Sequence, residues 1–209
     1  MIDWSRFPPH ILPRLQGHSA VKDLRRQPTI FADTSDFTRI DYGDIIHVDG
    51  RYFLIVGYTK EGRFGIDEQP KQWVPKTIDL ETGERKILKL VFHENFTIKL
   101  GQFQVTCYRS PEKEGRVLDL VGGNAMFMQG YSTLDEVGNL VRILDVIQGT
   151  RLDTTINRLA GDYETYVATH LEGILHRFLP AVEAIVLLHQ YGFKHGDIRR
   201  DHIIVDGQN

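Results

Sequence analysis

The stretch from His195 to Asp206, His-Gly-Asp-Ile-Arg-Arg-Asp-His-Ile-Ile-Val-Asp, constrains the fold of this chain more than any other. A run with helical character at 181–190 precedes it, and Tyr-Gly-Phe breaks that helix. An apolar Ile-Ile-Val strand follows the loop. The order of helix, break, His-x-Asp and strand presents the carboxylate of Asp197 in a loop. A surface turn in which Asp197 serves only as a cap is the simpler alternative, so other parts of the chain must decide.

β-Forming residues that flank turn residues predict two hairpins in the first half of the chain. A helix that begins near Ser110 and two further strands come next, and a largely helical part runs from about residue 153 to 190. This order predicts an α+β fold with an antiparallel sheet and one helix inserted before its last two strands. The strands are expected at 45–48, 52–56, 73–80, 86–92, 126–130 and 140–147.

Lys89 is a charged residue inside one of these apolar strands. Alternation places it on one face of the strand, together with Ile87 and Val91. A lysine among apolar side chains needs a partner, which favours a functional role for Lys89 over that of a solvent-facing lysine.

The helix expected from Ser110 offers that partner. Ser110 suits the N-cap and Pro111 the first helical position, and acidic residues follow in the first turn. Glu114 precedes apolar residues with helical spacing, so it is the predicted partner of Lys89, with Glu112 as the alternative. The acids would also be explained by their favourable interaction with a helix N-terminus alone.

Taken in order, these features resemble the protein-kinase-like superfamily over about residues 43–206. The His-Gly-Asp loop, four variable residues, a polar position and an apolar strand match the catalytic loop. Asp-Leu-Glu-Thr-Gly-Glu at 79–84 resembles the turn into the strand that carries the phosphate-binding lysine. The resemblance implies an ATP-binding phosphotransferase in which Asp197 accepts the proton of an acceptor hydroxyl. Lys89 would hold the phosphates and Glu114 would hold Lys89.

The resemblance also implies a nucleotide site for ATP with Mg²⁺. Gly62 and Gly65 are similar to the second half of a glycine-rich loop that approaches the phosphates, although a plain β-turn is the alternative. Residues 144–152 resemble the hinge that binds adenine. Leu144 would then lie behind the adenine, and the backbone of Asp145 and Ile147 would bind it.

Three departures from the family pattern bear on activity. Gly196 stands in place of the family's arginine, which contacts a phosphorylated activation loop. A glycine at this position is more common in atypical and small-molecule kinases, such as the aminoglycoside and choline phosphotransferases. His202 stands at the position of an asparagine metal ligand, whereas Mg²⁺ prefers oxygen ligands. No Asp-Phe-Gly motif, the source of the other metal contact, occurs before the last residue, Asn209. We therefore expect a fragment or truncated form that is inactive on its own, with a pseudokinase-like binding or scaffold module as the alternative function.

Three parts follow from this interpretation: an N-terminal arm at 1–42, an N-lobe at 43–147, and a hinge exit with the start of a helical C-lobe at 148–209. Apolar residues of the arm either dock on a neighbouring surface or belong to a partly ordered tail. A partial C-lobe exposes apolar surface and invites self-association. Pro180 should kink one long helix or begin a second. Whether the phosphate acceptor is a protein or a small-molecule hydroxyl stays open.

Composition excludes several other classes. A net charge of −3 does not provide the positive charge that binding to nucleic acid or an anionic membrane requires. No apolar run approaches the roughly 20 residues of a membrane span, and the N-terminus lacks the apolar core of a signal peptide. Cys107 is the one cysteine, so an internal disulfide framework is excluded. These observations predict a cytoplasmic protein.

Overall fold

Two compact units make up the chain in its computed structural model, and each is described by itself. The first contains Met1–Gly122 and Gln129–Val146, and the second contains Gly123–Met128 and Ile147–Asn209. The described residues are 2–58, 72–91, 95–108, 111–159, 161–196 and 198–206. The predicted α+β class is confirmed.

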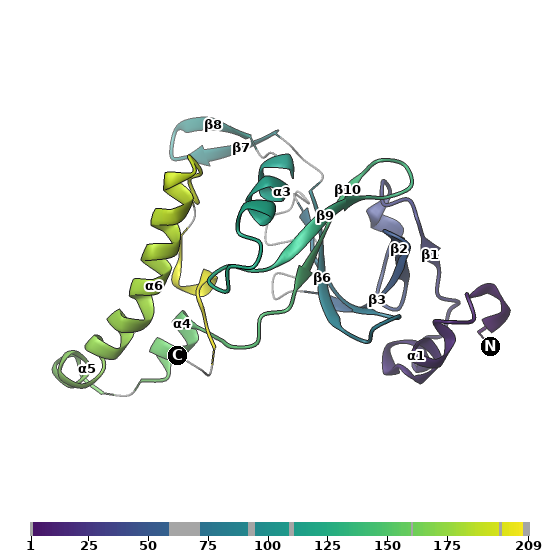
Figure 1. The fold of residues 1–209 in the computed structure, drawn as a ribbon, viewed down its shortest axis with the longest axis horizontal. Helices are drawn as coiled ribbons and strands as arrows, with labels where there is room; N and C mark the ends of the chain where they lie inside the picture. The colour runs from purple at the N-terminus through teal and green to yellow at the C-terminus, as the bar shows by residue number, and fades with distance from the viewer. Residues whose placement is uncertain are drawn as a thin grey trace. The chain divides into compact units, whose positions relative to one another are not determined.

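An eight-stranded sheet forms the centre of the first unit (Figure 1). Its order is β1-β2-β3-β5-β6-β10-β9, with β4 paired to β6, and all pairs are antiparallel except β1 with β2. The helix predicted before the last two strands is confirmed. Strand β1 was not predicted, and the single strand predicted at 73–80 is divided into β4 and β5. The strands are β1 (Ile30–Phe31), β2 (Ile45–Val48), β3 (Arg51–Tyr58), β4 (Gln72–Trp73), β5 (Pro75–Asp79), β6 (Arg85–Val91), β9 (Gly130–Leu134) and β10 (Leu140–Asp145).

The first hairpin and the main core follow the sequence pattern. Asp49 and Gly50 both have positive φ, 55° and 68°, as a tight two-residue hairpin turn requires. Alternate residues of the strands pack into one cluster, which buries their apolar surface on one face of the sheet. Its fully or nearly buried members are Ile40, Ile46, Val48, Phe53, Ile55, Trp73, Leu88, Leu90, Val141 and Ile143.

The strand predicted at 126–130 is wrong, because β9 begins only at Gly130. Asn124 accepts hydrogen bonds from the backbone N–H of Met126, at 3.0 Å through its side chain, and of Phe127, at 3.1 Å through its carbonyl. This local turn competes with strand pairing for the backbone. Met126 and Met128 are consequently exposed.

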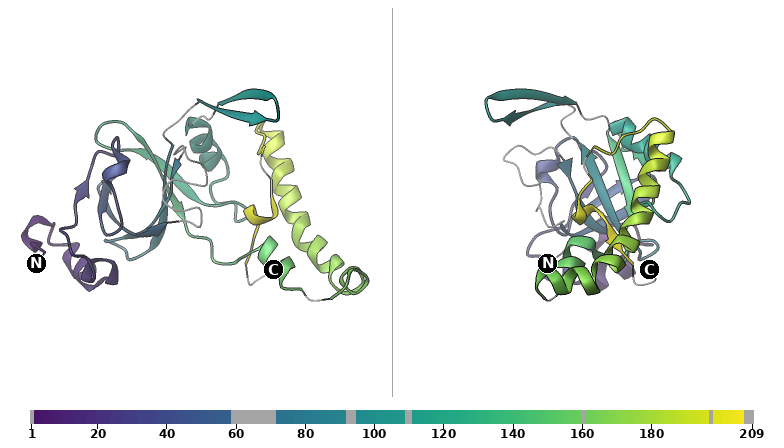
Figure 2. Two further views of the ribbon diagram at one scale, coloured as in Figure 1. Left: turned by 180° about the vertical axis from the view of Figure 1, so that it is seen from behind. Right: turned by 90° about the vertical axis from the view of Figure 1, so that its left-hand side faces the viewer.

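The N-terminal segment packs on β2 and β3 and forms a second core. It contains η1 (Trp4–Arg6), α1 (Leu12–Gly17), α2 (Ser19–Lys22) and η2 (Phe37–Arg39). The purple segment lies beside the blue strands in Figure 1 and in the left-hand view of Figure 2. Of the two alternatives for this segment, docking on a neighbouring surface is confirmed. The buried residues of this core are Phe7, Ile11, Leu15, Ala20, Val21, Ile45, Leu54 and Leu80.

Two further elements stand between β6 and β9 in the sequence. The strands β7 (Asn95–Leu100) and β8 (Phe103–Tyr108) form a separate two-stranded hairpin that was not predicted from the sequence. Helix α3 (Pro111–Leu120) follows and packs against β9 (Figure 1).

The second unit contains β11 (Thr150–Arg151), α4 (Leu152–Asn157), α5 (Tyr163–Thr169), α6 (Leu171–Gln190), η3 (Arg200–His202) and β12 (Ile204–Val205). Pro180 lies inside α6 and begins no helix. The predicted break after residue 190 is confirmed, since Gly192 has φ 78° and the N–H of Phe193 bonds the carbonyl of Leu188 at 2.9 Å. Within the described part of the chain, no helix is both long and apolar enough to cross a membrane.

Candidate functional site

Lys89 lies in β6 with a carboxylate partner. Its Nζ donates to both oxygens of Glu114, at 2.8 Å to Oε2 and 3.1 Å to Oε1. The lysine side chain is 23% exposed and the glutamate side chain 36% exposed, so solvent screens this ion pair only in part. The ion pair expected between these two residues is therefore present. The alternative, Glu112, is an exposed residue of the same helical turn.

Helix α3 brings Glu114 to the sheet because it can approach β9 closely. Gly115 is buried, and a Cβ at this position would lie 3.0 Å from Oγ of Ser132. A side chain at 115 would therefore require the Ser132 hydroxyl or the helix to shift. Pro111 at the start of α3 and the acids in its first turn are the sequence features that begin the helix here.

Arg142 is a second cationic partner of Glu114 that was not predicted from the sequence. It lies in β10 directly opposite Lys89 of β6, so both side chains leave the same face of the sheet. Its Nη1 is 3.1 Å from Oε2 of Glu114, and its side chain is 1% exposed. The signal that could have found it is the one applied to Lys89: an arginine inside an apolar strand, Leu-Val-Arg-Ile-Leu, needs a partner.

Two residues of the predicted hinge end strand β10. Leu144 is nearly buried, and the N–H of Asp145 donates to the carbonyl of Gln129 at 2.9 Å. The Asp145 carboxylate accepts from Nζ of Lys86 at 2.7 Å. Burial lowers the pKa of Lys86, but its hydrogen bonds to Asp145 and Glu84 outweigh burial and raise the pKa above the ordinary value. The Asp145 carboxylate is thus bound by Lys86, the residue directly opposite it on strand β6.

The third hinge residue, Ile147, lies in the second unit and is exposed. Gly149 follows it at a close approach to β12, since a Cβ there would lie 2.6 Å from the carbonyl oxygen of Val205. The absence of a side chain at Gly149 thus allows β11 to pair with β12, the short strand that follows the His-Gly-Asp segment in the sequence.

The remaining predicted site residues are placed only in part. Asp197, Gly62 and Gly65 lie outside the described residues. His202 is exposed, and its Nε2 is 2.7 Å from Nη2 of Arg199. Among the described residues, no group of three or more His, Cys, Asp or Glu side chains is arranged to hold a metal ion.

The chain is similar to several solved structures, two of which are described below. No protein-family model and no curated protein matches the chain. The likeness is to protein kinases. One structure, Rad53 1–466 in complex with AMP-PNP, is 17% identical over 74% of this chain and 34% of that chain, with a TM-score of 0.44. The other, a rhoptry kinase from Toxoplasma gondii, is 17% identical over 75% of this chain and 43% of that chain, with a TM-score of 0.37. The chain spans less than half the length of either kinase, and this likeness extends to fold and not to activity.

Proposed function

We propose that this chain carries the nucleotide-binding part of an ATP-dependent phosphotransferase of the protein-kinase-like superfamily. The observation that supports the proposal is the Lys89–Glu114 ion pair, with Nζ at 2.8 and 3.1 Å from the two carboxylate oxygens. A strand lysine held by a helix glutamate is the device by which this superfamily positions the phosphates of ATP. Catalysis in such enzymes is mostly positioning and neutralisation of charge.

The other roles in this proposal fall on residues of the hinge and loops. The backbone of Asp145 and Ile147 would bind adenine beside Leu144, and Gly62 and Gly65 would let backbone N–H groups approach the phosphates. Asp197 would accept the proton of a protein or small-molecule hydroxyl, and the side chain at position 202 would face a bound Mg²⁺.

A calorimetric titration with AMP-PNP, with and without Mg²⁺, tests nucleotide binding. We expect saturable binding with a dissociation constant between about 1 μM and about 1 mM, a range typical of enzyme substrates. Lys89→Ala should weaken it by about tenfold or more, because a charged hydrogen bond to phosphate contributes about 1.5–3 kcal/mol. Lys76→Ala, which removes an exposed lysine from the neighbouring strand β5, is the matched control. Equal affinity of the Lys89→Ala variant and the wild type would refute the proposed site.

A pseudokinase-like binding module is the second candidate. The observation that favours it is His202, an imidazole at the position of an oxygen metal ligand, with Arg199 at 2.7 Å from Nε2. A cation beside this ring opposes the approach of another cation. Binding of AMP-PNP that Mg²⁺ leaves unchanged would support this candidate, whereas phosphoryl transfer by the complete gene product would exclude it.

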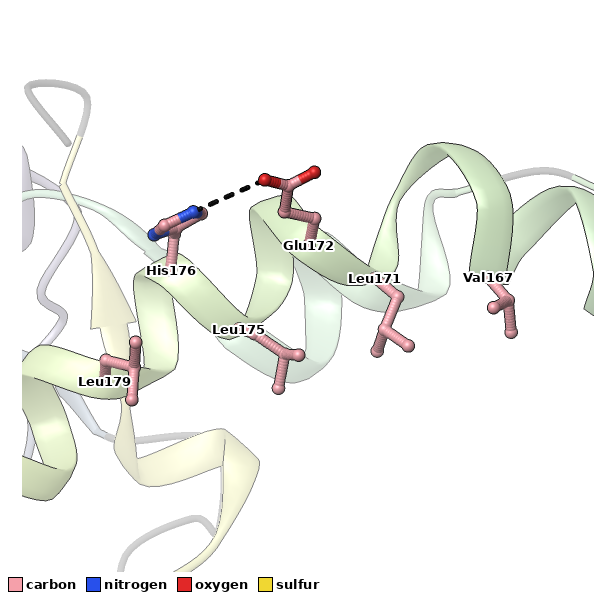
Figure 3. Close-up of a pocket in the computed structure, with 6 residues that line it drawn as sticks. All are labelled: Val167, Leu171, Glu172, Leu175, His176 and Leu179. Carbon is pink, nitrogen blue, oxygen red and sulfur yellow. Dashed lines mark ion pairs between the residues drawn. The ribbon is translucent and has the colours of Figure 1, made fainter.

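We also propose that copies of the chain associate through an apolar stripe on α5 and α6. Leu175 and Leu179 are 50% and 53% exposed. Figure 3 shows Val167, Leu171 and Leu175 pointing to one side of the helices, away from Glu172 and His176. Exposed apolar patches of this kind mark interaction sites.

Sedimentation velocity tests this association. The wild type should form a species larger than the monomer as its concentration rises, and Leu175→Glu with Leu179→Glu should return it to a monomer, because two charges cannot be buried without partners. Glu172→Lys, on the opposite side of the same helix, should leave the association unchanged. A wild type that stays monomeric at all concentrations would contradict the proposal.

A further inference from the structure

Arg142 has no role in the function proposed above, yet it is the most buried of the three charged side chains at this site. It is 1% exposed, against 23% for Lys89 and 36% for Glu114. Removing a guanidinium from water is costly unless it is paired and hydrogen-bonded. A buried arginine at this strand position therefore needs a physical reason.

The geometry around Glu114 supplies that reason. Oε2 of Glu114 lies 2.8 Å from Nζ of Lys89 and 3.1 Å from Nη1 of Arg142, while Oε1 lies 3.1 Å from Lys89. Lys89 and Arg142 face each other on neighbouring strands. One carboxylate thus joins helix α3 to both β6 and β10.

We propose that Arg142 is a positioning residue that holds Glu114 against Lys89, so that the ion pair is assembled before a nucleotide binds. The planar guanidinium is confined by the buried strand, whereas an ammonium sits on a flexible four-carbon stem. Glu114 also keeps a cationic partner when Lys89 interacts with an anion. The significance of this inference rests on the proposed function, because pre-assembly matters only if Lys89 binds phosphate.

The reactivity of the Lys89 amine reports directly on this ion pair. We would acylate the wild type, Arg142→Met, Arg142→Lys and Glu114→Gln with an N-hydroxysuccinimide ester, and follow each lysine by peptide mass spectrometry. Arg142→Met keeps the length of the side chain and removes its charge, and Glu114→Gln gives the rate for a Lys89 without its carboxylate. Lys76, an exposed lysine of β5, is the internal reference.

We expect Arg142→Met and Glu114→Gln to speed acylation of Lys89 by between about threefold and about thirtyfold, a range typical of residues that share one network. Arg142→Lys, which keeps the charge, should restore a rate near that of the wild type, and Lys76 should react equally in all variants. If Arg142 only competes for Glu114, its removal would strengthen the Lys89–Glu114 pair and slow acylation. A slower or unchanged rate in Arg142→Met would therefore overturn the inference.

Two features keep the test decisive. If Lys86, whose side chain is only 15% exposed and pairs with Asp145, also reacts faster in Arg142→Met, that variant is unfolded, and Arg142→Gln, which retains a hydrogen-bond donor, takes its place with the same expected result. The measurement needs no nucleotide. Absence of AMP-PNP binding would thus refute the proposed function and leave this inference standing, whereas an unchanged Lys89 rate would refute the inference and leave nucleotide binding untouched.

Discussion

Replacement of Glu114 by alanine is expected to lower the free energy of unfolding by about 2 kcal/mol. Loss of one partner from a buried ion pair costs about 3–5 kcal/mol, because the other charge stays buried. Arg142 is 1% exposed and would lose this carboxylate, but Glu114 itself is 36% exposed, so the full cost does not apply. The variant should also lose the link between α3 and the two strands of Lys89 and Arg142.

Chemical denaturation of the wild type and the variant measures this loss. Glu112→Ala is the matched control, since it removes an exposed acid from the same turn of α3 and should cost about 0.3–1 kcal/mol through its interaction with the helix N-terminus. Amide hydrogen exchange should show faster exchange in α3 for the Glu114 variant alone. Equal stability of the Glu114 and Glu112 variants would mean that the three charges do not hold the helix on the sheet.

The Lys89–Glu114 pair could be predicted from the sequence because both signals are local. Strand alternation places a lysine among apolar residues, and the cost of burying its charge demands a partner. The next helix offers acids in its first turn, and one of them has the spacing of a helix face directed at the sheet. The order of the strands followed from the same alternation and from short turns such as Asp49-Gly50.

Arg142 could not be placed from the sequence, because its role depends on strand register. It is opposite Lys89 only because β10 pairs with β6, and the two strands are separated by residues 92–139, which include the β7–β8 hairpin and α3. Such long-range pairing is fixed by the packing of the whole core and not by local patterns. The early start predicted for β9 has a local cause, since the Asn124 turn uses backbone groups that an apolar pattern does not reveal.

The N-terminal segment shows the same limit. Its weak hydrophobic periodicity could not distinguish a segment that packs on the sheet from a partly ordered tail. The structure shows that it packs on the sheet, because Ile11 and Leu15 are buried in a cluster that includes Leu54 of β3. Asp44, which is 1% exposed, accepts hydrogen bonds from both Nη atoms of Arg26, at 2.5 and 2.9 Å. This bidentate contact ties the segment to the start of β2, and it joins residues that are too far apart in sequence for a local pattern to indicate.

Replacement of Asp197, the proposed general base, by asparagine should reduce phosphoryl transfer by the protein between about 10²-fold and about 10⁴-fold, the range for loss of such a base. An amide cannot accept the proton of the acceptor hydroxyl, although it retains the size of the carboxylate. Binding of AMP-PNP should change less than about twofold, because the base acts on the acceptor and not on the nucleotide. Transfer of radioactive phosphate from ATP to a panel of protein and small-molecule hydroxyl acceptors measures the effect.

Asp201→Asn is the matched control for Asp197→Asn. It removes a carboxylate from the same loop, where the Asp201 side chain is 3.3 Å from the guanidinium of Arg199, and it should leave transfer within about threefold of the wild type because variable loop positions do not contact the reacting atoms. Full turnover by Asp197→Asn would remove the catalytic role from this residue. A wild type that binds AMP-PNP and transfers no phosphate would favour the pseudokinase-like module, in which the Lys89–Glu114 pair serves binding alone.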